Sequence, residues 1–345
     1  MHRLLSLFLL AFFAFLTAQI TGCKKDPDLS QNPAPVHFYV PKGWPEPVYK
    51  FENNPLTREG FELGRLLFND PRLSRDNSTS CGSCHQPFAA FAQTGHTFSH
   101  GVDGLVGTRN SPGIFNLAWH PSFFWDGGVN HIESQPLSPI ENPVEMDEKL
   151  DNIIAKLSQD ANYRKRFQTV FGTEEITTQR MMRALTQFMG AMISDNARYD
   201  QYMRGDINLT PQEISGLSVF EGFCAPCHKP PLFSDFSFRN NGLPPSGLND
   251  SGRAHITLQA TDLYKFKVPT LRNLRFTPPY MHDGRFNTLD EVLAHYESGI
   301  TSSTTLDPLL GNGIQMTAQQ KEDLKVFLNT LNDERFVTDP RFAEP

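Results

Sequence analysis

The residues best suited to chemistry form one short pattern that occurs twice, Cys-x-x-Cys-His. The first copy is CGSCH, with Cys81, Cys84 and His85, and the second is CAPCH, with Cys224, Cys227 and His228. This pattern is the attachment signature of c-type haem, in which two thiols add to the vinyl groups and the adjacent imidazole ligates the iron. We therefore predict two covalently bound haem c groups, with His85 and His228 as the proximal ligands.

Two other chemistries use paired cysteines. A zinc interpretation would gather all four thiolates into one site, but it leaves both histidines without a role. A thioredoxin-like redox site needs a strand–helix context, which neither motif has. Two complete copies, together with an export signal, favour haem attachment in the periplasm.

The fifth cysteine, Cys23, ends that export signal. A short basic start precedes an apolar run from Leu4 to Ile20, which is typical of a signal peptide. The sequence Ile-Thr-Gly-Cys at 20–23 resembles a bacterial lipobox, which implies cleavage before Cys23 and lipid on that residue. A plain signal peptide and an uncleaved anchor are the alternatives. We predict a lipoprotein signal peptide over 1–22 and a proline-rich tether over 23–55.

A lipid anchor predicts that the protein sits at the periplasmic face of a bacterial membrane and touches the membrane through its lipid alone. The outer membrane is favoured because Lys24, after the lipidated cysteine, is not the usual signal for retention in the inner membrane. The 345 residues carry a formal net charge of -7. No basic patch follows from this balance, which argues against a nucleic-acid partner.

Helical periodicity dominates the rest of the chain. Apolar spacing predicts helices over 56–68, 150–157 and 178–194, and capping boxes that begin at Thr210, Thr288 and Thr317 predict three more. The helix after Thr210 should run into CAPCH. No alternating run is long enough to propose a sheet, so the predicted fold class is mainly α. Residues 86–146 form a long, weakly helical stretch, and such loops are usually functional.

The two haem motifs also indicate a weak internal duplication, since each follows a predicted helix and precedes a loop. We predict two similar domains, an N-terminal one over 56–200 and a C-terminal one over 201–345, which meet near residue 200. The C-terminal helix is expected to pack back on the first domain.

Five further motifs appear in order between and after the haem signatures. They are TRNSP at 108–112, FWDGG at 124–128, QPLSPIENPVEM at 135–146, FKVPTLRN at 266–273 and PYMHDG at 279–284. With them the chain resembles the bacterial di-haem cytochrome c peroxidase family, including its MauG-type branch, over residues 56–335. The resemblance implies two cytochrome c-like haem domains with long functional loops. The N-terminal haem is then the peroxidatic site, and the C-terminal haem receives electrons.

The same resemblance assigns the residues around the peroxidatic haem. Glu145 matches the distal acid–base, Gln135 the amide that positions peroxide or water, and Pro139 the residue packed over the same face. A partly desolvated carboxylate suits the transfer of a proton from the inner to the outer oxygen of peroxide. Trp125 matches the inter-haem tryptophan, an oxidisable relay for electrons. The alternatives are an exposed glutamate, a loop-stabilising glutamine and a core aromatic residue.

The distal ligands follow from the resemblance less directly. In the peroxidase branch a loop histidine before a glycine ligates the peroxidatic haem at rest and leaves on activation. His100 matches it better than His96, although the loop is longer here and MauG-type members lack this ligand. For the second haem, the position of the peroxidase branch's methionine falls on Tyr296, the MauG-type choice. A phenolate stabilises ferric iron and lowers its potential. Met281 is the competing ligand, and a core tyrosine is the alternative role for Tyr296.

A calcium site between the haems is also implied by the resemblance. Its ligands would be the Asn110 side chain and the carbonyl groups of Thr277 and Pro279, and oxygen ligands suit Ca²⁺. Trp44 and Trp119 are interpreted as structural residues.

These features predict a periplasmic di-haem c peroxidase that reduces hydrogen peroxide to water with electrons from a small redox protein, a reduced cytochrome c or a cupredoxin. The alternative is a MauG-like oxidase that uses peroxide-derived high-valent haem to oxidise a protein or an organic substrate. A non-enzymatic electron carrier and a redox sensor are further competitors, and the carrier is hard to reconcile with Gln135 and Glu145. The sequence leaves a homodimer open and does not identify the donor, the need for reductive activation or the distal ligation of each haem.

Overall fold

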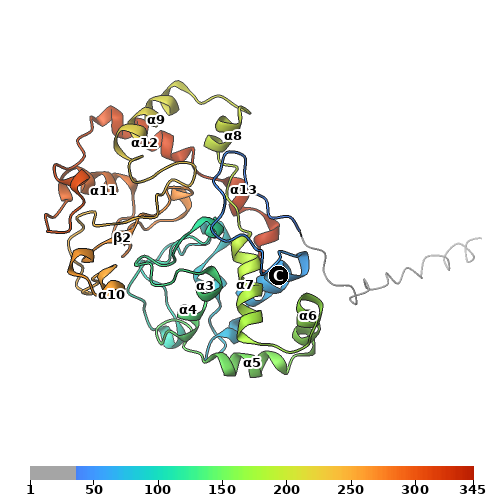
Figure 1. Cartoon of the computed structure of the whole chain (residues 1–345). Helices are drawn as coiled ribbons and strands as arrows, with labels where there is room; N and C mark the ends of the chain where they lie inside the picture. The colour runs from blue at the N-terminus through green and yellow to red at the C-terminus, as the bar shows by residue number, and fades with distance from the viewer. Residues whose placement is uncertain (1–35) are drawn as a thin grey trace, which may run out of the picture. The chain divides into compact units, whose positions relative to one another are not determined.

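The computed structural model describes residues 36–345, and helices dominate its architecture (Figure 1). The α-helices are α2 (Arg58–Phe68), α3 (Cys81–Cys84), α4 (Leu137–Glu141), α5 (Leu150–Ser158), α6 (Ala161–Phe171), α7 (Thr178–Gly190), α8 (Arg198–Arg204), α9 (Pro211–Phe223), α10 (Ala254–Thr257), α11 (Leu289–Ala294), α12 (Ala318–Asn329) and α13 (Glu334–Val337). Strands β1 (Phe238–Arg239) and β2 (Phe266–Lys267) form one antiparallel pair. The predicted mainly α fold is confirmed, and within 36–345 no helix is long and apolar enough to cross a membrane.

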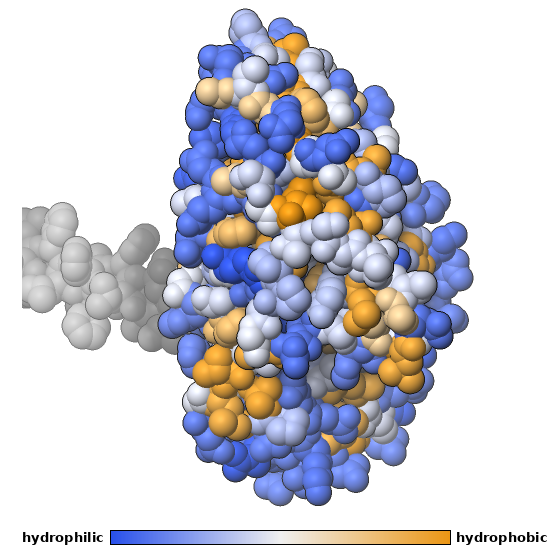
Figure 2. Space-filling view, turned by 90° about the vertical axis from the view of Figure 1, so that its left-hand side faces the viewer, coloured by the Kyte–Doolittle hydropathy of each residue, from blue (hydrophilic) through white to orange (hydrophobic). Residues whose placement is uncertain are grey.

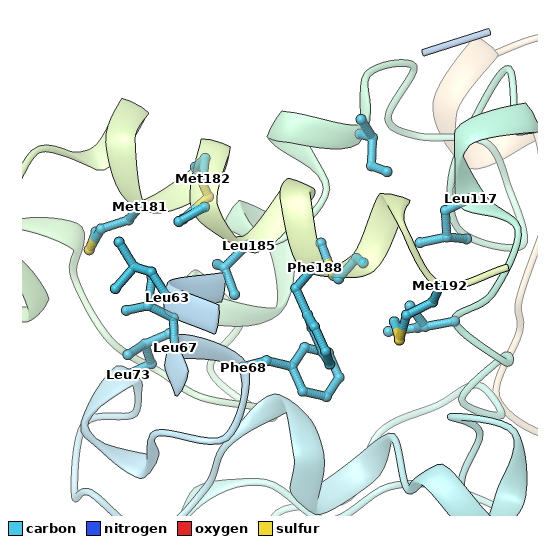
Figure 3. Packing of buried hydrophobic residues seen from close by; sticks show 14 of the residues in the cluster. Leu63, Leu67, Phe68, Leu73, Leu117, Met181, Met182, Leu185, Phe188 and Met192 are labelled. Carbon is cyan, nitrogen blue, oxygen red and sulfur yellow. The ribbon is translucent and has the colours of Figure 1, made fainter. Parts of the chain in front are cut away.

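The first hydrophobic core forms where α2 packs across α7. Thr57 caps α2 by accepting a hydrogen bond from the Gly60 N–H. Figure 3 shows Leu67 and Phe68 of α2 beside Leu185 and Phe188 of α7. The Phe68 and Phe188 rings lie 5.2 Å apart, so these apolar faces stabilise each other by excluding water.

The second hydrophobic core repeats this crossing with α9 and α12. Phe220 of α9 lies 5.1 Å from Phe327 of α12, measured between ring centroids. The three capping boxes predicted at Thr210, Thr288 and Thr317 are all present, at the starts of α9, α11 and α12. Each core therefore combines a helix near its haem motif with a later helix of the same half.

A glycine makes each crossing possible. A Cβ on Gly64 would lie 2.0 Å from the Ala184 carbonyl oxygen, and one on Gly216 would lie 2.0 Å from the Asp323 carbonyl oxygen. Four residues after each glycine comes the phenylalanine of the crossing. This repeated Gly-x-x-x-Phe pattern supports the interpretation that the two halves are duplicates.

The C-terminus returns to the first half, as expected. Phe336 and Val337 of α13, followed by Phe342, are buried in the first core. Phe336 lies 5.8 Å from Phe91, measured between ring centroids. The second core itself extends only to Leu331, so the predicted C-terminal domain over 201–345 includes a last segment that packs elsewhere.

Residues 36–55, the described part of the predicted tether, pack against the rest of the fold. Trp44 packs edge-on against Trp119 at 5.0 Å, and Phe51 is buried in the same aromatic cluster. The Trp119 indole N–H donates to the Pro45 carbonyl group at 2.8 Å. Prolines keep residues 36–55 out of helices, but the aromatic side chains still bury against the fold. The signal peptide, Cys23 and the tether residues before 36 lie outside the described residues.

The long stretch over 86–146 contains only short helical turns and α4, as predicted. On the molecular face shown in Figure 2, hydrophobic residues form several separate patches among hydrophilic ones. The face therefore has no single continuous apolar surface.

The α9–α12 crossing gives a stability prediction. Gly216→Ala should lower the free energy of unfolding by about 1–3 kcal/mol, because the added methyl group overpacks a backbone contact. Guanidinium unfolding followed by circular dichroism measures this difference. Ser218→Ala, at an exposed site on the same helix, is the control and should have little effect. Unchanged stability of Gly216→Ala would contradict this account of the crossing.

Candidate haem-binding cavity

A cavity of about 1060 Å³ reaches both motif histidines, His85 and His228. The long loop, β2 and the segment after β2 form much of its wall. It also brings together most of the residues predicted to have a role: Asn110, Trp125, Gln135, Pro139, Glu145, Cys224, Cys227, Thr277, Pro279, Met281 and Tyr296. The cavity therefore connects residues that lie far apart in the sequence.

The first motif is positioned by the short helix α3. Ser80 and Ser83 form a capping box at its start, and the His85 N–H donates to the Cys81 carbonyl group at 2.9 Å. His85 Nδ1 lies 2.6 Å from the Phe91 carbonyl oxygen and donates to it. This bond leaves Nε2 as the nitrogen available to ligate a metal. Burial lowers the pKa of His85 to about 4, so the ring is neutral, as a ligand must be.

The second motif has the same arrangement at the end of α9. The His228 N–H donates to the Cys224 carbonyl group at 2.9 Å. His228 Nδ1 lies 3.2 Å from the Phe233 carbonyl oxygen and 3.1 Å from that of Pro269. Burial lowers the pKa of His228 as well. Both histidines are thus neutral and held with Nε2 available.

The thiols fit haem attachment better than zinc. All four motif cysteines are free of disulfides. Burial raises the pKa of Cys81 and that of Cys224 to about 12, so both groups are neutral thiols. Within residues 36–345 no group of three or more histidine, cysteine or acidic side chains is arranged to hold a metal ion. The zinc alternative is therefore wrong for the described chain, whereas the donor set of each motif fits a haem c.

One cavity wall carries the residues predicted for the peroxidatic face. Glu145 Oε1 accepts a hydrogen bond of 2.6 Å from the Asn142 amide. Burial raises the pKa of Glu145, and the Asn142 bond opposes part of that rise. The Met146 N–H donates to the Pro139 carbonyl group at 3.1 Å, which folds this turn back on α4. Besides their burial, the Glu145 carboxylate raises the pKa of the Cys81 and Cys84 thiols, so it lies at the His85 end of the cavity.

Trp125 lines the cavity and is bonded to two segments that are distant in sequence. Its indole N–H donates to the Asn110 carbonyl group at 2.8 Å, and its own carbonyl oxygen accepts from the Lys267 N–H at 2.7 Å. Asn110 belongs to the segment whose Pro112 carbonyl group influences the pKa of His85, whereas Lys267 is two residues from Pro269, which bonds His228. Trp125 therefore connects the surroundings of one motif, through its indole, to those of the other, through its backbone.

Tyr296 and Met281 lie together at the second motif. Tyr296 follows α11 in a π-helical turn over His295–Gly299, so the predicted helical stripe continues with a wider turn. Burial raises the pKa of Tyr296 to about 12, partly offset by a hydrogen bond from Asn241. The Asn241 amide also donates to Met281 Sδ at 3.5 Å. The geometry leaves both side chains as candidate distal ligands.

His96 and His100 are exposed and do not line the cavity. Their rings lie 5.1 Å apart in the loop. His100 pairs with Val106 in a β-bridge, and Ser99 takes the position on the cavity wall. The structure therefore does not bring His100 to the position that a distal ligand of the first haem would need.

The predicted calcium ligands share one part of the wall. The Asn110 amide donates to the Thr97 carbonyl group at 3.3 Å, and Thr277 and Pro279 line the same cavity. Thr97 is a further oxygen donor that the sequence interpretation did not include.

Several cavity residues were missed from the sequence. They are His120, Asn142, Asn241, Lys267 and His282. Lys267 lies between two apolar residues in FKVPTLRN. A charged residue between apolar neighbours was the sequence feature that could have marked it as a cavity residue. Asn142 and His282 also lie in quoted motifs, whereas nothing in the sequence distinguishes Asn241 or His120.

Comparisons with known proteins agree with this geometry. A family model described as di-haem cytochrome c peroxidase matches residues 58–208. The chain is 36% identical over 296 residues to the methylamine utilization protein MauG of Methylorubrum extorquens, covering 84% of this chain and 83% of the relative. It is 36% identical over 240 residues to the cytochrome c551 peroxidase of Nitrosomonas europaea, covering 67% and 71%.

A solved structure gives the same result for the fold. A MauG-like protein associated with microbial copper homeostasis superposes with a TM-score of 0.83 at 34% identity, covering 89% of this chain and 98% of that one. The family implies two haem c groups and an oxidoreductase of the peroxidase type. By these likenesses and by its two haem-binding motifs, the chain belongs to the di-haem cytochrome c peroxidase family.

Proposed function

We propose that the chain reduces hydrogen peroxide at the haem of Cys81, Cys84 and His85, with electrons that enter at the haem of Cys224, Cys227 and His228. The observation that carries this proposal is a single cavity that reaches both histidines, with Glu145 and Trp125 on its wall. A haem bound at each motif would supply an iron that exchanges single electrons and, at the first motif, an open position for peroxide.

Glu145 is the proton carrier in this proposal. Its carboxylate accepts the proton of the peroxide oxygen nearer the iron and returns it to the outer oxygen, which leaves as water. Burial supports this role because it raises the pKa of Glu145 toward the working pH. Two electrons from the donors and two protons then complete the conversion of one peroxide to two waters. Gln135 orients the peroxide with its amide, and Pro139 limits the space over the same face.

Trp125 relays electrons between the halves. The hydrogen bond from its indole to Asn110 and the backbone bond from Lys267 support this role, because they fix the ring in one orientation. A fixed ring needs little rearrangement when it gains or loses an electron.

The electron donor is a small reduced redox protein, a cytochrome c or a cupredoxin. Phe223 and Leu309 support entry at the second haem, because both are exposed and line the cavity, and Phe223 directly precedes Cys224. The net charge of -7 favours a basic donor surface.

We propose that Asn110, Thr277 and Pro279 bind Ca²⁺, which metal analysis before and after chelation would test.

The proposed cellular location rests on the lipobox-like sequence at 20–23. Lipid on Cys23 would hold the protein at the periplasmic face of the outer membrane. Cys23→Ser should then move the protein from the membrane fraction to the soluble periplasmic fraction, and an unchanged distribution would oppose the anchor.

A second candidate is a MauG-like oxidase that passes the oxidising equivalents of peroxide to a protein or an organic substrate. Tyr296 on the cavity wall favours it, as does the likeness to the MauG of Methylorubrum extorquens. The two candidates share the peroxide site and differ in what is oxidised.

Glu145→Gln should slow the reaction with peroxide roughly 10²–10⁴-fold, because the amide cannot carry the proton. The wild-type rate should fall as the pH drops through the raised pKa of Glu145, since only the carboxylate accepts a proton, and this limb should vanish in the variant. Stopped-flow absorbance at several pH values measures both effects. Glu141→Gln, exposed on the same segment, is the matched control. A persistent acid limb in Glu145→Gln would assign the proton transfer to another group.

Tyr296→Phe should change the coordination of the second haem, because it removes the phenolate. Electron paramagnetic resonance of the ferric protein should then lose one low-spin signal and gain a high-spin one. Met281→Leu should leave the spectrum unchanged. The reverse result, with Met281→Leu changing the spectrum, would make methionine the ligand.

Donor dependence separates the two candidate functions. With peroxide present, a reduced cytochrome c or cupredoxin should be oxidised rapidly, two donors for each peroxide. Trp125→Phe should slow this turnover while both haems stay attached. If neither donor accelerates the consumption of peroxide, the oxidase is the better proposal.

A further inference from the structure

Lys267 is a charged side chain inside the cavity without a carboxylate partner. It lies on β2 (Figure 1), and its Nζ donates to the Ser122 carbonyl group at 2.7 Å. Within residues 36–345 no aspartate or glutamate forms an ion pair with it. An ammonium group has three donors, so two of them remain available to a group in the cavity.

The other cavity cations differ from Lys267 in this respect. Arg109 is paired with Asp126 and Asp250, and Arg272 is paired with Asp200. Arg239 is likewise paired, with Asp235 and Asp307. The Asp126 carboxylate, which is paired with Arg109, raises the pKa of Lys267 through space but forms no ion pair with it. Because a buried charge without an ion-pair partner is costly, an anion facing Lys267 would stabilise it.

Two more polar groups beside Lys267 are without partners. The Ser122 hydroxyl group is buried and has no hydrogen-bond partner among the described residues. The His120 ring lines the same cavity and packs 4.6 Å from the Phe236 ring, and no hydrogen bond to its nitrogens is present within 36–345. Burial lowers the pKa of Lys267 to about 8, although the Asp126 carboxylate opposes part of that fall. Lys267 and His120 therefore both line the cavity, and the unpartnered Ser122 hydroxyl belongs to the residue whose carbonyl group Lys267 bonds.

Lys267 lies on a segment that contacts both Trp125 and the second motif. Lys267 bonds the Trp125 carbonyl group through its backbone, and its neighbour Val268 accepts a hydrogen bond from the Ser234 hydroxyl at 2.6 Å. The next residue, Pro269, accepts from His228. The backbone of Lys267 is therefore held between Trp125 and the residue that bonds the second motif histidine.

We propose that Lys267, with His120 beside it, binds a propionate carboxylate of the second haem and thereby raises the reduction potential of that haem. The inference rests on the second haem of the proposed function. A positive charge beside the carboxylate offsets its negative charge, which otherwise stabilises ferric over ferrous iron. The lysine thus adjusts the driving force for electron transfer from the second haem past Trp125.

The test is a spectroelectrochemical titration of both haems in the whole protein. Lys267→Met should shift the equilibrium of the second haem toward the ferric form about tenfold, a fall of about 59 mV, and should shift the first haem less. Lys267→Gln, which keeps a donor for the Ser122 carbonyl group, should give the same fall, and Lys267→Arg should stay near the wild type. Lys265→Met is the matched control, because Lys265 pairs with Asp262 and does not line the cavity.

The possible results distinguish a wrong assignment of the second haem from a wrong role for Lys267. If mass and haem content show that the wild-type protein carries no haem at the second motif, the cofactor assignment is overturned. Two haems with an unmoved second potential in both neutral variants would overturn the role of Lys267. Added acetate should leave the wild-type potential unchanged at constant ionic strength. A saturable acetate effect that disappears in Lys267→Met would mean that the ammonium binds a free anion, which would also overturn the propionate assignment.

Discussion

The rest of the structure depends on one constraint, which is that a cavity of about 1060 Å³ must reach both motif histidines at once. The walls of this cavity come from loops distant in sequence, so packing outside the cavity must hold them in place. The two helix crossings at Gly64 and Gly216 provide rigid supports at close backbone contact. The aromatic cluster around Trp119 adds a third, built partly from the N-terminal segment.

Polar contacts hold the loops that the cores do not reach. Arg272 is fully buried, pairs with Asp200 at 2.7 Å and lies 4.8 Å from the Trp44 ring, so it connects the second half to the N-terminal segment. Arg109 pairs with Asp126 of the long loop and also with Asp250 of the second half, so it joins the two. Such buried pairs add geometric definition more reliably than net stability. Here they define where the cavity walls stand.

Burial also sets the chemistry of the cavity groups. It keeps both motif histidines neutral, with Nδ1 engaged and Nε2 available. It raises the pKa of the Glu145 carboxyl group, which suits a proton carrier. Burial also makes the charge of Lys267 costly, because this ammonium group has no ion-pair partner within residues 36–345. An ammonium group without a functional role is usually found in solvent or beside a carboxylate.

Local sequence determined the haem motifs, the mainly α character and the three capping boxes, because each depends on residues within a few positions of one another. The resemblance of the ordered motifs indicated which residues share a wall, and the cavity brings Trp125, Gln135 and Glu145 together. Only the tertiary structure decided the rest. It packed residues 36–55 as part of the fold, because aromatic burial outweighs the proline-rich composition of that segment. It left His100 outside the cavity, because loop pairing sets side-chain direction. Within residues 36–345 it gave Lys267 no ion-pair partner, because ion pairing depends on contacts between segments distant in sequence.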